Sequence, residues 1–388
     1  MPRLTIVADR HIWEVKSAFS ELPGYQVNLT TLERNEINAE AVRDADILLV
    51  RSGIKVGADL LAGSRIRFVA TATVGDDHLD KPYMDNHGIA FATAAGSSTR
   101  SVVEYILASL LQLYREQCID LPESRIGIIG AGRIGSSVIR VSKALGMNVL
   151  ANDPPLARQG AKELTGLSDL LQRADILTLH TPLTRTGKDA TYHLIGDDQL
   201  KTFNGRCIIN AARGGVLHDE ALLRWLNGKK SRYAVLDCWE HEPNISRELL
   251  SHPQMIIATP HIAGHSVDGK AANTQFVYDA LCRFLAITPA WHMRQYLPEH
   301  KSGPEVISSA PSLMASIANA CLSLYPIAED HKRLRCSLDG NDDELAASFV
   351  RQRRHYPPRR QWDIKPVRFE KTEPQLMDIA TAIGLRIM

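Results

Sequence analysis

Short apolar runs alternate with amphipathic stretches through the first hundred residues. Three of these runs predict buried strands, at residues 4–8, 47–50 and 68–73. The segment 14–22 predicts a helix, and this alternation is typical of a parallel sheet covered by helices. Ligands bind outside the carboxyl ends of such strands. Ser52 and Gly75 follow two of the strands and Thr73 ends one of them, so we expect these residues to hold a small substrate.

A second alternating stretch begins with a long helix at 101–115, whose apolar residues recur at helical spacing and which we expect to link two lobes. Further strands are predicted at 126–129, 148–151, 176–179, 207–210, 234–237 and 255–258. Together with a helix at 134–145 they make a complete doubly wound domain. A helix at 270–285 follows, and we expect it to return to the first lobe.

After about residue 287 prolines interrupt the pattern, and residues 351–360 are strongly basic. This change in sequence pattern predicts a third, smaller domain. We interpret the basic stretch as a solvated helix that faces a second subunit. An alternative is that one of its arginines, supplied by a partner subunit, reaches a phosphate of the substrate.

The overall composition excludes several classes of partner. The formal net charge is +1, which gives no reason to expect nucleic acid or an anionic membrane as partner. No apolar run approaches the roughly 18 residues of a membrane-spanning helix, and no signal peptide is evident, so we expect a cytoplasmic protein. None of the six cysteines forms a C-x-x-C pair, which favours buried, reduced thiols and no metal site.

A glycine-rich turn, Gly130, Gly132 and Gly135, lies between a predicted strand and a helix. Gly130 permits the tight turn, Gly132 lets backbone N–H groups approach a pyrophosphate, and Gly135 allows close helix packing. Asp153 ends the next strand, where a carboxylate bonds the ribose hydroxyls and repels a 2′-phosphate. NAD is therefore predicted over NADP, although Arg158 nearby would tolerate a phosphate. The alternative is a glycine turn that binds nothing.

Three later strands are each followed by a polar side chain, namely Arg213, Glu242 and His261. Taken singly, these residues fit a surface ion pair, a loop acid and a structural histidine. Together they supply what oxidation of a hydroxy acid needs. The cation holds a carboxylate, the imidazole takes the hydroxyl proton, and the acid orients the imidazole.

With these motifs and spacings, residues 45–285 resemble the D-2-hydroxyacid dehydrogenases. The resemblance implies that Arg213 anchors the substrate, Glu242 partners the histidine and His261 is the general acid/base. It implies that Asp237 holds the nicotinamide amide. Further cofactor contacts are implied at Arg133, Ile134, Thr181, Ala211, Ala212, Arg213 and Gly264.

Segments 51–56, 68–73 and 102–105 resemble one subgroup of that family more closely, as do Tyr356 and residues 359–362 of the tail. That subgroup implies a small phosphorylated 2-hydroxy acid as substrate and an extra C-terminal domain that pairs two subunits. It also implies a substrate contact at His265, where the subgroup has tyrosine. Rival interpretations are a dehydrogenase of the phosphoglycerate or glyoxylate type and a non-catalytic NAD-sensing interaction protein.

The predicted fold class is α/β, with three domains. Residues 1–98 and 266–286 form a flavodoxin-like substrate lobe, and residues 99–265 form a doubly wound NAD domain. Residues 287–388 form a small α+β dimerisation domain.

Overall fold

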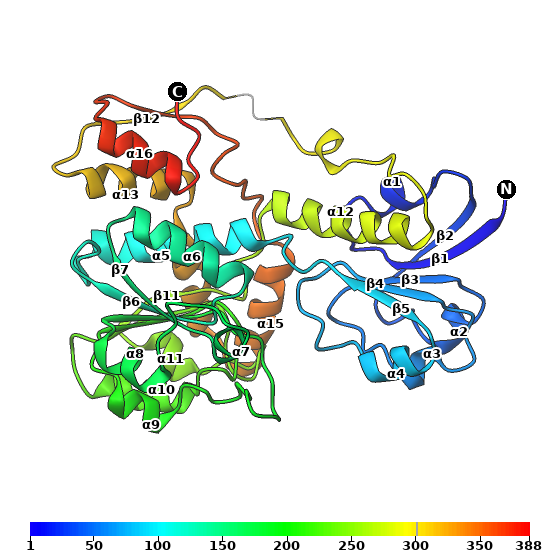
Figure 1. Ribbon diagram of the computed structural model, residues 1–388, viewed down its shortest axis with the longest axis horizontal. Helices are drawn as coiled ribbons and strands as arrows, with labels where there is room; N and C mark the ends of the chain where they lie inside the picture. Colours follow the sequence, from blue (N-terminus) through cyan, green and yellow to red (C-terminus); the bar gives the residue numbers. More distant parts are fainter. Residues whose placement is uncertain (300–301) are drawn as a thin grey trace. The chain divides into compact units, whose positions relative to one another are not determined.

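The computed structural model describes residues 1–299 and 302–388, which divide into two units (Figure 1). Unit 1 contains Met1–Ser98 and Ser266–Glu299. Unit 2 contains Thr99–His265 and the C-terminal residues through Met388. Each unit is described by itself below.

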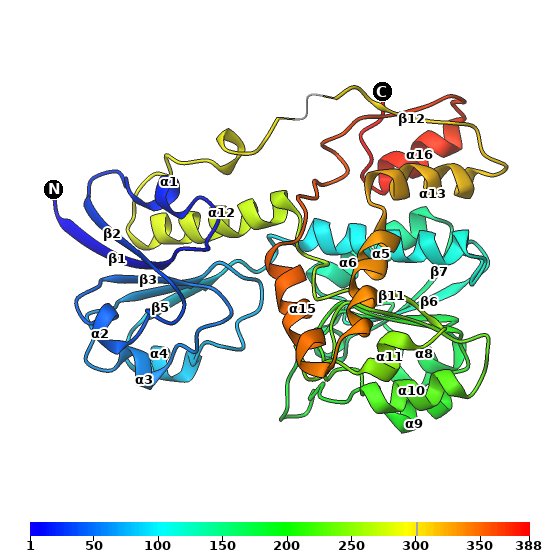
Figure 2. The ribbon, with the colours of Figure 1, turned by 180° about the vertical axis from the view of Figure 1, so that it is seen from behind.

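Unit 1 is built on a five-stranded parallel sheet in the order β2-β1-β3-β4-β5, which is the flavodoxin-like order. Its strands are β1 (Arg3–Asp9), β2 (Gln26–Leu32), β3 (Ile47–Val50), β4 (Phe68–Thr71) and β5 (Ala90–Thr93). Helices α1 (Val15–Phe19) and α12 (Val267–Phe284) cover one face. Helices α2 (Ala39–Val42), α3 (Ala58–Leu61) and α4 (Lys81–Asn86) cover the other, as both ribbon views show (Figure 2).

Residues 287–299 pack with unit 1, whereas the sequence places them at the start of the C-terminal domain. The cause is Trp291, which is 7% exposed and packs against Tyr278 of α12 with ring centroids 5.6 Å apart. The Tyr278 hydroxyl also accepts the backbone N–H of Trp291. A short 3₁₀ helix, η1 (Met293–Gln295), follows.

Unit 2 contains a six-stranded parallel sheet in the order β11-β10-β9-β8-β6-β7. Its strands are β6 (Arg125–Ile129), β7 (Asn148–Asn152), β8 (Ile176–Leu179), β9 (Cys207–Asn210), β10 (Tyr233–Leu236) and β11 (Met255–Ala258). Its helices are α5 (Thr99–Arg115), α6 (Arg133–Ala144), α7 (Pro154–Arg158), α8 (Leu167–Arg173), α9 (Asp197–Thr202), α10 (Asp219–Asn227) and α11 (Arg247–Ser251). Each predicted strand is present, because buried parallel strands are continuous apolar runs.

The C-terminal residues, called the tail here (302–388), form helices and one small parallel sheet within unit 2. Its elements are β12 (Glu305–Ile307), α13 (Leu313–Leu324), α14 (Ile327–Arg335), η2 (Cys336–Asp339), α15 (Asp342–Arg354), β13 (Val367–Phe369) and α16 (Pro374–Ala382). Apolar side chains of α13 and α16 share one core with α5 and α6. The tail therefore completes the core of unit 2.

Helix α14 of the tail protects an edge of the six-stranded sheet. Strand β11 lies at that edge, and the backbone N–H of Ala258 donates to Nδ1 of His331, 3.0 Å away. Burial, with the charge of Arg335, lowers the pKa of His331 to about 4. The imidazole is therefore neutral at pH 7 and accepts a hydrogen bond that the strand edge would otherwise leave unmade.

The prediction of a solvated helix across residues 351–360 is wrong for its second half. Helix α15 ends at Arg354, and Arg359 is 7% exposed. The Arg359 guanidinium lies over the Tyr325 ring and donates to the carbonyl of Ala263, 2.7 Å away. These contacts replace hydration of the charge and dock the tail on the loop that follows β11.

All six cysteines are free, and five of them are buried as expected. Cys336 is exposed, contrary to the expectation, because it lies in η2 on the tail surface. Among the described helices, none is both long and apolar enough to cross a membrane.

Candidate active site

Every strand of the six-stranded sheet is followed by a segment that carries a predicted site residue. Because the strands are parallel, these segments leave the sheet at one edge. In chain order, the strands β6 to β11 lead to the glycine turn, Asp153, Thr181, Arg213, Glu242 and His261. One edge therefore gathers the predicted cofactor and catalytic residues.

The glycine turn has the form that a pyrophosphate cradle requires. Gly130 has a φ of 92°, and a Cβ there would lie 2.8 Å from the His180 carbonyl. At Gly135 a Cβ would lie 1.9 Å from the Gly130 oxygen. At Gly132 no described atom lies within 4 Å of a Cβ, so this position faces open space. Gly132 is also the N-cap of α6 and offers no side-chain cap, which leaves the first N–H groups of the helix for an anion.

Asp153 orders the segment after β7. One carboxylate oxygen accepts the Ala131 N–H at 2.9 Å, and the other caps α7 by accepting the Leu156 N–H at 3.0 Å. The carboxylate thus lies directly beside the glycine turn, where the ribose hydroxyls of a dinucleotide bind. Arg158, the residue that would favour a 2′-phosphate, forms an ion pair with Asp189.

The remaining cofactor candidates surround the same edge. Ile134 is half-buried and Arg133 is exposed in the first turn of α6, while Ala211 and Ala212 follow β9 directly. The Thr181 hydroxyl oxygen is buried and has no hydrogen-bond partner among the described residues. An orphaned buried hydroxyl fits a ligand group, so the residues present suit NAD.

His261 and Glu242 form a hydrogen-bonded pair. His261 Nδ1 lies 2.8 Å from Glu242 Oε2, and the two side chains are 27% and 20% exposed. The other carboxylate oxygen, Oε1, accepts the Trp239 N–H at 2.9 Å. An ionised carboxylate only accepts hydrogen bonds, so Nδ1 carries the hydrogen and Nε2 is left as the proton acceptor.

The electrostatic surroundings keep Glu242 ionised. Burial alone would raise the pKa of Glu242, but the His261 charge and hydrogen bond, the Trp239 N–H and the charge of Arg353 together lower it. Arg353 belongs to α15 of the tail. Arg353 of the basic stretch therefore acts on Glu242, a predicted catalytic residue of its own chain.

Asp237 fixes the loop that carries His261. The Asp237 carboxylate is 1% exposed and accepts the N–H groups of Ile262 (2.7 Å) and Ala263 (2.9 Å) and the Thr259 hydroxyl (2.7 Å). His261 has a φ of 55°, a left-handed conformation that costs a non-glycine residue energy. These bonds hold the histidine in that conformation, and contact of Asp237 with the nicotinamide amide stays a prediction.

Arg213 is positioned by its neighbours in the turn after β9. The Asn210 side chain donates to the Arg213 carbonyl at 3.0 Å and accepts the Ala212 N–H at 3.1 Å. A Cβ at Gly214 would lie 1.8 Å from the Trp239 carbonyl, so this turn packs tightly on the segment that leads to Glu242. Arg213 itself is half-buried.

Sequence reasoning missed three positioning residues of unit 2. Asn210, Thr259 and Tyr105 were not proposed as site residues from the sequence. The Tyr105 hydroxyl lies 2.7 Å from the Thr259 hydroxyl, which donates to Asp237. For Asn210 and Thr259 the available signal was a polar side chain at or directly after the end of an apolar strand, whereas Tyr105 lies within α5.

The substrate candidates of unit 1 lie after its strands as predicted. The Thr73 hydroxyl donates to the Gly75 carbonyl at 3.0 Å and contacts the Thr71 hydroxyl at 2.8 Å. Thr71 in turn contacts His78, which the sequence did not suggest. Ser52 is exposed in the turn after β3.

Gly264 and His265, both half-buried, end the loop after His261. The His265 ring meets the Tyr356 ring edge-on, with centroids 6.4 Å apart. Tyr356 comes from the tail and bonds Asp330 at 2.7 Å. The tail thus supplies a tyrosine ring next to the position where His265 replaces the tyrosine of the resembled subgroup.

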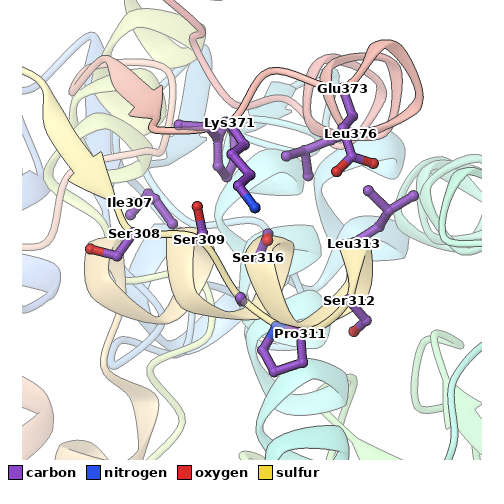
Figure 3. A pocket seen from close by; sticks show the side chains of 12 residues that line it. Ile307, Ser308, Ser309, Pro311, Ser312, Leu313, Ser316, Lys371, Glu373 and Leu376 are labelled. Carbon is purple, nitrogen blue, oxygen red and sulfur yellow. The ribbon is translucent and has the colours of Figure 1, made fainter.

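A cavity of about 240 Å³ lies elsewhere, within the tail (Figure 3). Ser309, Ser316 and Lys371 line it, and Lys371 extends into it between β13 and α13. None of its lining residues follows a strand of the six-stranded sheet. We therefore do not assign substrate binding to this cavity.

Comparisons with known proteins agree with this geometry. Residues 107–263 match the family described as D-isomer specific 2-hydroxyacid dehydrogenase, NAD binding domain. An erythronate-4-phosphate dehydrogenase of Azotobacter vinelandii is 39% identical over 384 residues, which cover 98% of this chain and 99% of that protein. One of Hydrogenovibrio crunogenus is 38% identical over 389 residues, which cover 100% of both.

Solved structures show the same fold. A D-lactate dehydrogenase from Aquifex aeolicus, complexed with NAD and lactic acid, has a TM-score of 0.60 at 24% identity. It covers 73% of this chain and 95% of its own. An NAD⁺-bound 3-phosphoglycerate dehydrogenase of Entamoeba histolytica has a TM-score of 0.61 at 21% identity and covers 73% of this chain and 96% of its own.

The chain therefore belongs to the D-isomer specific 2-hydroxyacid dehydrogenase family, whose cofactor here is NAD. Within that family, its full-length similarity is to the erythronate-4-phosphate dehydrogenases.

Proposed function

We propose that the chain oxidises 4-phospho-D-erythronate to (R)-3-hydroxy-2-oxo-4-phosphooxybutanoate with NAD, in pyridoxal 5′-phosphate biosynthesis and in the cytoplasm. The observation that carries the proposal is similarity to erythronate-4-phosphate dehydrogenases over the whole chain, tail included. The Arg213, Glu242 and His261 set supports catalysis over an NAD-sensing role, because it retains a hydrogen-bonded acid–imidazole pair.

His261 is the general base in this proposal. Its Nε2 takes the proton of the substrate C2 hydroxyl, while Glu242 holds the Nδ1 hydrogen and stabilises the imidazolium that forms. Bound NAD supplies the hydride acceptor for the hydrogen on C2. Asp237 keeps His261 in place by holding the N–H groups that follow it.

Arg213 binds the substrate carboxylate and polarises the neighbouring oxygen. Ser52, Thr73, Gly75 and His265 contribute further substrate contacts. In the cofactor site, the glycine turn holds the pyrophosphate and Asp153 holds the ribose. The substrate phosphate requires a cation, and Arg353 is a candidate that belongs to the same chain.

A substrate panel tests the proposal. Purified full-length protein is given NAD with 4-phosphoerythronate, 3-phosphoglycerate and D-lactate, and NADH with glyoxylate, while NADH absorbance is followed. We expect the highest kcat/KM for 4-phosphoerythronate. Preference for 3-phosphoglycerate or glyoxylate would support those rival activities, and NAD binding without any turnover would support the sensing role.

We also propose that the tail pairs two subunits. Two apolar side chains of the tail support this, since Val306 is 47% exposed on β12 and Val350 is 42% exposed on α15. Light scattering of the full-length protein should give twice the chain mass of 43.0 kDa. A monomer at all concentrations would rule the pairing out.

A further inference from the structure

Three histidines gather around one carboxylate outside the catalytic pair. His193 Nε2 lies 2.6 Å from Glu240 Oε1, and His241 Nε2 lies 3.9 Å from the same oxygen. The His193 and His218 rings stack with centroids 4.2 Å apart. One ligand atom from each of His193, His218 and Glu240 can be chosen so that all three lie within 4.8 Å of one another.

Neighbouring groups hold this cluster in shape. The Tyr192 ring stacks on His193 with centroids 3.9 Å apart. Glu240 accepts the backbone N–H of Asp219 at 3.3 Å, and Asp219 accepts that of Glu240 at 3.2 Å. His193 has a φ of 51°, so its backbone is held in the left-handed region. The ligand atoms are therefore fixed by surrounding contacts, in the way that groups bonded to the ligands orient them in metal sites.

The cluster also has free ligand capacity. His218 makes no side-chain hydrogen bond within the described parts of the chain, and its ring is half-buried. Glu240 is 8% exposed, and Asp219, also 8% exposed, is its close neighbour. Within the described residues, these two adjacent carboxylates have no arginine or lysine partner, and a divalent cation satisfies them better than a histidine alone.

We propose that His193, His218 and Glu240 bind a divalent transition-metal ion of the zinc type. Two imidazoles and one carboxylate are typical zinc ligands, whereas magnesium and calcium prefer oxygen ligands. Tetrahedral ligands at about 2.1 Å from zinc lie about 3.4 Å apart. The contact of 2.6 Å between His193 and Glu240 must therefore lengthen by less than 1 Å. His241, with a side chain 76% exposed, can move to serve as a fourth ligand.

The ligands come from three segments that also carry site residues. His193 follows Thr181 in the loop after β8, His218 follows Arg213, and Glu240 precedes Glu242. Metal binding would join these three segments. No metal motif was visible in the sequence because the ligands are spaced too far apart to form one.

A second group, Cys238, Glu242 and His261, also has ligand atoms within 4.8 Å. Cys238 is 1% exposed, and burial raises the pKa of its thiol well above the usual range. A thiol must lose its proton to bind a metal, so this group is the poorer site.

The test measures Zn²⁺ binding to metal-stripped, full-length protein by competition with a coloured chelator. We expect one tight Zn²⁺ per chain and no competition by Mg²⁺. His218→Phe keeps a ring for stacking but removes the nitrogens, and it should weaken binding by more than the roughly 10–100-fold that loss of a supporting residue costs. His218→Asn, with the N-cap side chain that helices favour, should lose binding as well.

His87→Asn is the matched control, because His87 also stacks on a tyrosine, Tyr83, but among the described residues contacts no second imidazole. This variant should bind Zn²⁺ like the wild type, and so should His261→Asn. Zn²⁺ should raise the Tm of the wild type and not that of His218→Phe. Unchanged binding in both His218 variants, loss only in His261→Asn, or no saturable Zn²⁺ binding by the wild type would overturn the proposal.

Discussion

The carboxylate of Glu242 makes two different hydrogen bonds, so glutamine cannot replace it. Oε1 accepts the Trp239 N–H and Oε2 accepts from His261. A glutamine has one acceptor oxygen. Whichever way the amide turns in Glu242→Gln, one of these two donors loses its acceptor.

Both orientations damage catalysis. With its oxygen on Trp239, the amide NH₂ faces Nδ1 of His261, so the ring hydrogen must move to Nε2 and block proton uptake. With its oxygen on His261, the buried Trp239 N–H is left unpaired, at about 1–3 kcal/mol of stability. The negative charge that stabilises the imidazolium is lost in either case. We therefore expect kcat to fall by roughly 10²–10⁴-fold.

The assay compares kcat and kcat/KM for 4-phosphoerythronate with the dissociation constant for NAD, measured by fluorescence. NAD affinity should change little, because the glycine turn and Asp153 follow other strands. Substrate deuterated at C2 should show whether hydride transfer limits the rate. Glu248→Gln, at an exposed position in α11, is the control and should behave like the wild type. A kcat close to the wild-type value, or a loss confined to NAD binding, would refute the reasoning.

Three further predictions concern the turn, a buried acid and the tail. Gly132→Ala should fold with an unchanged Tm yet bind NAD weakly. Gly135→Ala should lose stability, because its Cβ would lie 1.9 Å from a backbone oxygen. Equal Tm values for the two variants would contradict this prediction. Burial raises the pKa of Glu104 from 4.5 to about 7, against the opposing effects of the Trp362 N–H, Arg359 and Arg100. A raised folded-state pKa gives stability that is fully present below pH 4.5 and is lost as the pH rises to about 7, a difference of roughly 3 kcal/mol. Denaturant unfolding at pH 5 and pH 8 should show this loss in the wild type and much less of it in Glu104→Gln; parallel losses would count against it. Arg353→Ala should raise KM for 4-phosphoerythronate by roughly 10–100-fold, because a charged hydrogen bond is lost. KM for unphosphorylated erythronate should stay unchanged. Arg354→Ala, at an exposed position, is the control. Equal effects on both substrates would show that Arg353 does not bind the substrate phosphate.

Much of the fold was predictable because its buried parallel strands are unbroken apolar runs. The strands at 47–50, 176–179 and 207–210 were predicted with their observed bounds. Strand β2 was missed because it lies at a sheet edge and none of its residues is fully buried. Strand β5 was missed because its four residues are only half-buried. An apolar pattern cannot reveal strands that are not fully buried.

The positions of site residues could be predicted only where those residues follow the end of a strand. Arg213, Glu242 and His261 follow neighbouring strands, so their gathering could be inferred from chain order. Contacts between loops that are distant in the sequence could not be inferred in this way. The stacking of His193 on His218 and the docking of Arg359 on Ala263 depend on how loops fold over one another, and local sequence carries no signal for it.

The docking of the tail has a consequence for the timing of activity during synthesis. The loop that carries His261 is bonded at Ala263 by a side chain 96 residues further along, and Ala258, the last residue of the strand before it, is bonded by one 73 residues further along. A growing chain emerges from the ribosome in sequence order. The glycine turn can thus fold early, but these two bonds form only after His331 and Arg359 have been synthesised. We expect nascent chains to acquire the cofactor site before they become competent in catalysis.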